Sequence, residues 1–415
     1  MGDWGLRDIP KRAFARLTGL SIATVALALA SCQQTVNYGL PTDIQQEPAF
    51  QATSLPEKTG PALGEVLGSG PTRVAMLLPL SAPGNGARVA AEYRNAAELA
   101  LETRGEHTME LVIKDTGGTP QGARARAEEA LREGAALVLG PVFSTSVASA
   151  ASVTRPGKRY AIAFSSDPTA ASPGVYLMSF LPSQVVDRVI SYSVSIGSPS
   201  IAAILPEGAY GALVEQQLRA SLKQRGGRLT GVSYYRYDNQ SLVTAVEQLL
   251  PAIEEADAIF LPDGGQAPTA LARVLQSEGV NLLEKRLIGT GQWRSSDLKS
   301  AYLQGGIFAD MDETYFTPFR ENYREKFGAD PTVNGGLGFD SVMLAADLLA
   351  SGNPEALSRS NLENNRGYLG VTGAYRFLPD GLSSRSLAIY QIQEGATVVL
   401  QPAPAHPGAI TTAQY

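Results

Sequence analysis

The feature that most constrains the fold of this 415-residue chain is an alternation of short apolar segments with longer segments of helical periodicity. Short apolar runs bounded by turn residues are typical of buried strands. Because parallel strands need a crossover that is usually a helix, the alternation predicts an α/β fold with parallel sheets covered on both faces. Two blocks, roughly 73–180 and 185–305, predict two doubly wound lobes. The predicted strands are residues 73–79, 110–115, 136–139, 159–164, 200–205, 229–235, 258–261 and 286–289.

Helices are predicted between these strands, and the remaining residues, 311–401, are predicted to hold two more helices and a closing hairpin. The apolar residues recur at helical spacing in 212–223, 243–253 and 269–278, and again in 319–327 and 337–349. The hairpin is expected around Pro379-Asp380-Gly381, which is a turn-forming sequence.

The N-terminus reads as an export signal that ends at Cys32, the single cysteine of the chain. A net positive segment, residues 1–16, precedes the apolar stretch Leu17–Leu29, which is shorter than the about 20 residues needed to cross a bilayer. The run Leu29-Ala30-Ser31-Cys32 resembles the lipobox of bacterial lipoproteins. This resemblance implies that residues 1–31 are a removed signal peptide and that Cys32 carries the lipid, palmitate included. The alternative is a free cysteine in an ordinary signal peptide or buried helix.

Residues 33–72 are rich in proline and glutamine and contain few clustered apolar residues. Such a stretch buries too little surface to offset its ordering entropy, so 32–72 is predicted to be a lipidated N-terminus followed by a disordered tether. The tail 402–415 is expected to be flexible for the same reason. The net charge of −6 and the absence of Lys/Arg runs argue against a nucleic-acid partner.

Several motifs of the body, in their order along the chain, resemble the type I periplasmic binding proteins, and most closely the leucine/isoleucine/valine-binding branch. The motifs are Val74-Ala75-Met76-Leu77-Leu78-Pro79-Leu80-Ser81, Asp115 with Gln121-Gly122-Ala123, Leu139-Gly140-Pro141, and Ala203-Ile204-Leu205-Pro206 with Tyr210-Gly211. The resemblance covers 73–401 and implies two lobes joined by three crossovers. It places lobe 1 at about 73–181 and 312–370, and lobe 2 at about 182–311 and 371–401.

Hydroxyl residues follow two predicted strands of lobe 1, where a ligand carboxylate would bind. Ser144, Thr145 and Ser146 begin a predicted helix, and Ser165 and Ser166 follow the strand ending at Phe164. The carboxyl ends of adjacent parallel strands form the crevice in which doubly wound sheets bind ligands, and a helix N-terminus favours anions. The resemblance implies the same role for these positions. Equally, Ser144 could cap its helix, and Ser165-Ser166 could form a turn.

The ammonium half of an amino-acid site is incomplete in lobe 2. Tyr210 stands where relatives place an aromatic residue against the ligand, but no carboxylate occurs in the segment after Gly289, which reads Thr290-Gly291-Gln292-Trp293. Asp263 could supply the charge from a neighbouring loop, or it could be a turn residue in Asp263-Gly264. An ammonium buried without a counter-charge costs several kcal/mol, which argues against tight binding of a zwitterion.

The sequence predicts neither an enzyme nor a cofactor. Its two histidines, His107 and His406, lie in a predicted loop and in the tail, so no histidine-based triad or zinc cluster is expected. No G-x-S-x-G and no phosphate-binding loop occurs. The acidic run Asp310-Met311-Asp312-Glu313 has the ligand type for a hard cation, although a solvated acidic loop explains it more simply.

Two functions remain open. In Phe180-Leu181-Pro182, Ser165-Ser166-Asp167 and the long tether, the chain resembles lipoproteins of this fold that activate penicillin-binding proteins, the peptidoglycan synthases, although it lacks the helical-repeat domain of the enterobacterial members. The alternative is the substrate-binding lipoprotein of an ABC importer for branched-chain or related amino acids, with a permease as partner and a small amino-acid-like ligand. Gln33 after the lipidated cysteine implies the outer membrane in a Gram-negative host, which favours the activator.

Overall fold

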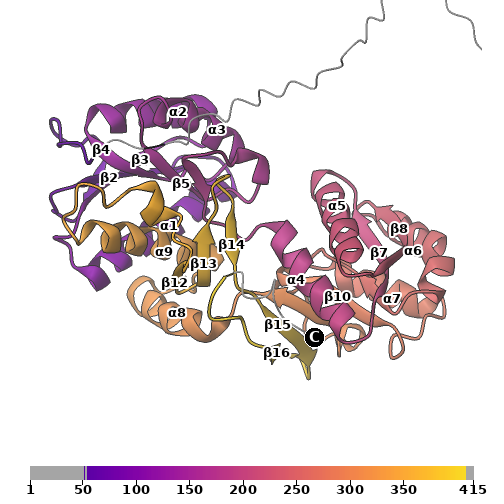
Figure 1. Ribbon diagram of the computed structural model, residues 1–415. Coiled ribbons are helices and arrows are strands. Elements are labelled where there is room, and N and C mark those ends of the chain that lie inside the picture. Colours follow the sequence, from indigo (N-terminus) through magenta and orange to yellow (C-terminus); the bar gives the residue numbers. More distant parts are fainter. Residues whose placement is uncertain (1–50, 52–53, 408–415) are drawn as a thin grey trace, which may run out of the picture. The chain divides into compact units, whose positions relative to one another are not determined.

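The computed structural model describes residue 51 and residues 54–407, all of which lie in one compact unit, Glu47–Tyr415 (Figure 1). The predicted signal peptide, Cys32 and Gln33 lie outside the described residues, as do residues 408–415 of the predicted tail. Across the described part of the chain, no helix combines the length and apolarity that a membrane span requires.

The first sheet has six strands in the order β1-β3-β2-β4-β5-β6. Five of them run parallel, and the short edge strand β1 pairs antiparallel with β3. The strands are β1 (Glu65–Leu67), β2 (Arg73–Leu78), β3 (Glu110–Asp115), β4 (Ala135–Leu139), β5 (Tyr160–Ala163) and β6 (Val175–Leu177).

Helices cover both faces of this sheet because its strands are apolar on both sides. Alternate residues of β2 divide between two cores: Met76 packs with helices α1 (Asn85–Arg104) and α9 (Val333–Leu349), and Leu77 packs with helices α2 (Pro120–Arg132) and α3 (Ser144–Thr154). Helix α8 (Glu313–Phe327) joins the first of these cores. The continuous apolar runs that predicted buried parallel strands are thus explained.

The second sheet has seven strands in the order β16-β15-β11-β10-β9-β7-β8. Its strands are β7 (Ser200–Pro206), β8 (Arg228–Tyr235), β9 (Ala258–Phe260), β10 (Arg286–Thr290), β11 (Ile307–Asp310), β15 (Ala388–Gln393) and β16 (Ala396–Gln401). The first five are parallel, and β15 and β16 are antiparallel additions. Helices α4 (Pro182–Ser195) and α5 (Ala209–Gln224) cover one face, and α6 (Asn239–Glu254) and α7 (Ala267–Ser277) cover the other.

A small antiparallel sheet belongs with the first sheet, which corrects one predicted boundary. It consists of β12 (Tyr368–Gly370), β13 (Gly373–Phe377) and β14 (Ser383–Arg385). Phe377 stacks on Tyr176 of β6, with ring centroids 5.0 Å apart, and joins the core that contains α9. Residues 371–385 therefore lie with lobe 1 and not with lobe 2, because the partner that fixes this hairpin is a ring about 200 residues away in sequence.

The chain passes between the two sheets three times, as the resemblance implies. It leaves the first sheet after β6 to enter α4, returns from β11 into α8, and passes from β14 into β15. The α/β prediction with two doubly wound sheets and three crossovers is confirmed. Three 3-10 helices and one short α-helix complete the fold: η1 (Pro168–Ala170), η2 (Gly291–Ser295), η3 (Ala301–Leu303) and α10 (Arg359–Leu362).

The predicted disordered tether is wrong for its last part, residues 54–72, because this segment packs on lobe 1. We call residues 54–67 the N-terminal strap. The Leu55 N–H donates to the Pro354 carbonyl at 3.3 Å, and the Thr59 N–H donates to the Glu133 carbonyl at 3.1 Å. Further along, β1 forms the edge of the first sheet.

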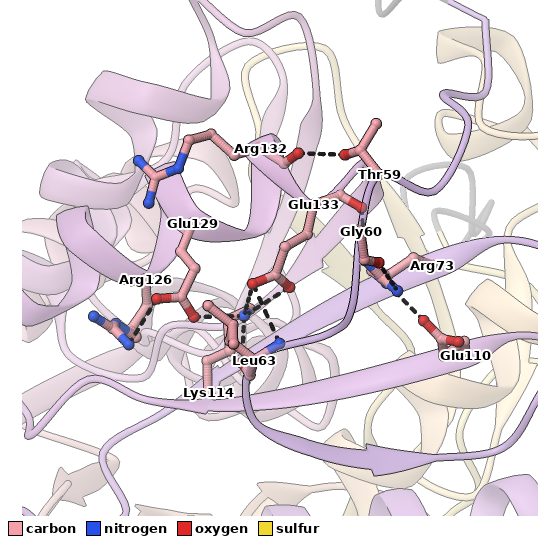
Figure 2. Close-up of polar contacts among 10 residues, drawn as sticks. All are labelled: Thr59, Gly60, Leu63, Arg73, Glu110, Lys114, Arg126, Glu129, Arg132 and Glu133. Atoms are coloured by element: carbon pink, nitrogen blue, oxygen red, sulfur yellow. Dashed lines mark hydrogen bonds and ion pairs between the residues drawn. The ribbon is translucent and has the colours of Figure 1, made fainter.

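A buried lysine fixes the strap (Figure 2). Lys114 Nζ lies 2.6 Å from Glu129 Oε1 and 2.9 Å from Glu133 Oε2, and it donates to the Leu63 carbonyl of the strap at 2.5 Å. A buried ammonium needs such partners. Arg73 bridges the Glu133 carbonyl, at 2.8 Å, and the Gly60 carbonyl, at 3.3 Å. Charged side chains from the body thus hold a strap that is poor in apolar residues.

Candidate functional site

Lobe 1 brings three of the predicted serines to one hollow at the carboxyl ends of β4 and β5. Ser144, Ser165 and Ser166 line a cavity of about 590 Å³, together with Phe143, Phe164, Phe180 and Asn334. Gly140, with φ +84°, makes the turn that leads from β4 to α3; a Cβ there would lie 2.4 Å from the Leu77 carbonyl oxygen. The predicted Thr145 is exposed and does not line this cavity.

Helix α3 begins at the cavity without a side-chain cap. Its N-cap residue is Phe143, which makes no capping hydrogen bond, so the alternative that Ser144 caps the helix is wrong. Intrahelical bonding starts with the Val147 N–H, which donates to the Phe143 carbonyl at 2.9 Å. The N–H groups of the preceding turn therefore have no acceptor within the helix. This is the arrangement that binds carboxylates and phosphates at helix N-termini.

Asp167 places a negative charge beside these hydroxyls. Its Oδ1 accepts from the Thr169 hydroxyl at 2.7 Å and from the Thr169 N–H at 3.0 Å. These hydrogen bonds, with a further one from the Ser144 hydroxyl, hold the pKa of Asp167 below its usual value. The Asp167 N–H in turn donates to Ser165 Oγ at 3.1 Å, so Ser165 forms a turn as well as lining the cavity.

Lobe 2 brings Tyr210 and Asp263 to the carboxyl ends of its strands, but their polar atoms are already bonded. The Tyr210 hydroxyl donates to the Pro262 carbonyl at 3.2 Å. Asp263 Oδ2 accepts from the hydroxyls of Tyr235, at 2.6 Å, and Tyr237, at 2.5 Å, and Oδ1 accepts from the Gly264 N–H at 2.8 Å. Asp263 is only 9% exposed. We call Tyr235, Tyr237 and Asp263 the tyrosine–aspartate cluster.

The two tyrosines remain protonated donors over a wide pH range. Burial first, and then the Asp263 carboxylate, raise the pKa of Tyr235 far above its usual value and that of Tyr237 to about 12. Burial also raises the pKa of Tyr210. The sequence reasoning missed Tyr235 and Tyr237, although their two-residue spacing at the end of a predicted strand was an available signal.

The segment after β10 carries one charged side chain, Arg294, and two carboxylates balance its charge. Trp293 turns inward, fully buried, and its Nε1–H donates to the Leu261 carbonyl at 2.8 Å. Arg294 pairs with Asp310 and lies 3.2 Å from Glu313 Oε1. As the sequence indicated, this segment contains no carboxylate. Its charged residue is Arg294.

The acidic run at 310–313 is occupied by internal partners. Asp310 pairs with Arg294, and burial nevertheless raises the pKa of Asp310. Asp312 caps α8 by accepting from the Thr314 N–H at 3.0 Å, and Glu313 pairs with Arg320 at 3.0 Å. In residues 51 and 54–407, no group of three or more His, Cys, Asp or Glu side chains is placed to hold a metal ion.

Comparison with known proteins gives one family. A family model described as "periplasmic binding protein" matches residues 71–397. Among curated proteins, an uncharacterized protein of Rickettsia prowazekii is 21% identical over 338 residues, which are 78% of this chain and 86% of that protein.

Solved structures with the same fold are substrate-binding proteins. A structure described as a putative branched-chain amino acid ABC transporter from Rhodospirillum rubrum has a TM-score of 0.70 and 20% identity, and covers 79% of this chain and 99% of its own. A solute-binding protein of an ABC transporter from Rhodopseudomonas palustris, in complex with 3,4-dihydroxybenzoic acid, has a TM-score of 0.59 and 18% identity, and covers 82% and 99%. At these identities the likeness establishes the two-lobed type I fold.

Proposed function

The chain belongs to the periplasmic binding protein family, and from that premise we propose that it is a non-enzymatic lipoprotein of the cell envelope that acts through protein contacts. On this proposal, it is a penicillin-binding protein activator that regulates peptidoglycan synthesis. Its partner on this proposal is a penicillin-binding protein, and Cys32 carries the lipid anchor.

The observation that carries this proposal is the tyrosine–aspartate cluster. A free amino acid needs an unoccupied carboxylate for its ammonium group. Asp263 already accepts hydrogen bonds from two tyrosine hydroxyls and one backbone N–H, and the neighbouring segment Thr290-Gly291-Gln292-Trp293 contains no carboxylate. Freeing Asp263 would leave the buried Tyr235 hydroxyl without its partner, which costs about 1–3 kcal/mol. Lobe 2 therefore opposes the binding of a zwitterion, which argues for a role other than amino-acid delivery.

The strap limits the length of chain that connects the proposed lipid anchor to lobe 1. If Cys32 is lipidated, the connecting chain extends only to residue 53, because the strap packs on lobe 1 from residue 54 onward. The greatest reach of 21 residues is about 70 Å, compared with about 130 Å for 40 residues. With Gln33 directing the protein to the outer membrane, such a reach suits a regulator that meets its partner in the periplasm.

A second candidate is the substrate-binding subunit of an ABC importer, and the hollow in lobe 1 favours it. The uncapped N-terminus of α3 and the hydroxyl of Ser166 offer donors to a carboxylate, whereas the Ser144 hydroxyl already donates to Asp167. The Rhodopseudomonas palustris protein is in complex with 3,4-dihydroxybenzoic acid, a carboxylate without an ammonium group. On this candidate, the ligand is a small carboxylate, and branched-chain amino acids bind less well than their deaminated analogues.

A ligand titration separates the two candidates. Residues 47–415 are titrated by calorimetry with leucine, isoleucine, valine and 3,4-dihydroxybenzoate. The activator proposal expects no saturable heat with any of them. Saturable binding that is lost in a Ser144→Ala/Ser166→Ala double variant would overturn it in favour of the importer candidate.

Crosslinking in living cells tests the partner directly. The full-length lipoprotein is crosslinked in its native envelope, and its adducts are identified by mass spectrometry. The activator proposal expects a penicillin-binding protein among the adducts, and expects a Cys32→Ala variant to lose that adduct while it remains folded. An adduct with an ABC permease, and none with a peptidoglycan synthase, would contradict the proposal.

A further inference from the structure

The second sheet ends in an edge strand that carries no charged residue, although its pairing with β15 shifts register between Ile389 and Tyr390, as at a β-bulge. Strand β16 pairs only with β15 among the described strands and lies at the rim of its sheet (Figure 1). Its consecutive residues Val398, Val399 and Leu400 are 41%, 47% and 39% exposed. Natural proteins shield such edges with charged residues, proline, bulges or short strands. No charged residue occurs between Gly395 and the end of the chain at Tyr415.

The register shows which backbone groups of β16 are open. The Ile392 N–H donates to the Gly306 carbonyl at 2.9 Å, and its carbonyl accepts from the Gly305 N–H at 2.8 Å, so its backbone faces β11. In an antiparallel ladder this direction alternates along the strand. Thr397 lies opposite Ile392, and Val399 lies opposite Tyr390. The backbone N–H and C=O groups of Thr397 and Val399 therefore point away from β15, toward the open edge.

One of the two edge strands of the first sheet, β1, is protected. Strand β1 has only three residues, and its Glu65 pairs with Arg94 of α1. Its exposed Val66 is therefore flanked by a charged pair, whereas β16 offers six residues without a charge. Strand β16 can therefore accept a further strand without burying a charge.

We propose that β16 docks on β16 of a second copy of this chain, joining two seven-stranded sheets into one across a two-fold axis. With Val398 of both copies on the axis, Thr397 of one copy lies opposite Val399 of the other. Both pairs use the open backbone groups and exchange both of their N–H···O bonds. The arrangement is self-complementary, as a two-fold interface requires. It brings the two Val398 side chains face to face and Val399 against Thr397, and such β-branched pairs stabilise a sheet.

The contact is small, so the dimer is expected to be weak in solution. A stable interface buries about 800 Å² on each partner, which is more than one six-residue strand supplies. Sedimentation equilibrium is the appropriate test because it resolves weak self-association. Residues 47–415 form one compact unit and are used for this test. The average mass is expected to rise toward twice the monomer mass between about 1 μM and about 1 mM protein.

Three variants make the test specific. Val399→Lys is expected to raise the dissociation constant at least about tenfold by placing a charge at the edge. Val399→Pro removes only an outward N–H and is expected to abolish the dimer. The matched control is Val66→Lys, which changes an exposed valine on the edge strand β1 of the first sheet. It is expected to leave the dissociation constant of the dimer unchanged. Melting temperatures show that each variant is folded. A wild-type protein that stays monomeric, or a dimer that survives both Val399 variants, would overturn the proposal.

Discussion

The carboxyl-end edges of the two sheets differ in what their polar groups are free to do. In lobe 1, an uncapped helix and the hydroxyls of Ser144 and Ser166 surround an open hollow. In lobe 2, Asp263 is 9% exposed and bonded to two tyrosines. At the first edge, the N–H groups of the first turn of α3 have no acceptor within the helix. At the second edge, the Asp263 carboxylate holds two strands' ends together through the tyrosine hydroxyls.

The largest expected effect comes from removing the carboxylate of lobe 2. Asp263→Ala leaves the buried Tyr235 hydroxyl and the Gly264 N–H without their acceptor, so we expect the free energy of unfolding to fall by about 2–3 kcal/mol. Urea unfolding followed by circular dichroism measures this loss. The matched control is Asp167→Ala in lobe 1, whose hydrogen bonds are exposed and whose loss is expected to cost less than about 1 kcal/mol. Equal losses in the two variants would remove the distinction between the edges.

A smaller loss is expected when only one donor of the cluster is deleted. Tyr235→Phe keeps the buried ring and removes one hydroxyl, so unfolding should become easier by about 1–1.5 kcal/mol. Combined with Asp263→Ala, which removes the acceptor, the two changes form a double-mutant cycle that isolates their interaction. Residues in one hydrogen-bond network are expected to show a coupling of at least about 0.5 kcal/mol. Additive effects would show that the contact between Tyr235 and Asp263 does not stabilise the lobe.

The sequence was sufficient for eight strands of the two large sheets, but it missed β1, β6, β11, β15 and β16, and it did not predict this cluster. Strands such as β2, buried at all six positions, have apolar runs that local reasoning can find. The serines at the ends of β4 and β5 were predictable because carboxyl ends of parallel strands share one edge. The contact of Tyr235 with Asp263 joins the end of β8 to the loop after β9, and that of Lys114 with the strap joins residues 51 positions apart. Such pairs join polar groups that are distant in the sequence, so the periodicity of apolar residues does not predict them.

Titration of Tyr237 tests the cluster without unfolding the protein. Its pKa is raised to about 12, by burial first and by Asp263 second, from the usual value of about 10. A raised pKa means that the stabilisation is complete below about pH 10 and is lost as the pH rises through 12. Other tyrosines, Tyr234 and Tyr368 among them, also titrate late, so the ultraviolet absorbance of phenolate should show one late-titrating group fewer in Tyr237→Phe than in the wild type. In Asp263→Asn, that group should titrate nearer pH 10, and an unchanged titration would mean that Asp263 does not act on it.

The smallest effect on stability is expected on the open edge. Ser144 and Ser166 are partly or fully exposed, and neither caps a helix, so Ser144→Ala and Ser166→Ala should each change the free energy of unfolding by less than about 0.5 kcal/mol. Ser165 is the internal control, because its buried Oγ accepts the Asp167 N–H and Ser165→Ala should cost about 1 kcal/mol. The same urea unfolding measurement serves all three variants. A loss above about 1 kcal/mol in Ser144→Ala would show that lobe 1, like lobe 2, has committed its polar groups to its own structure.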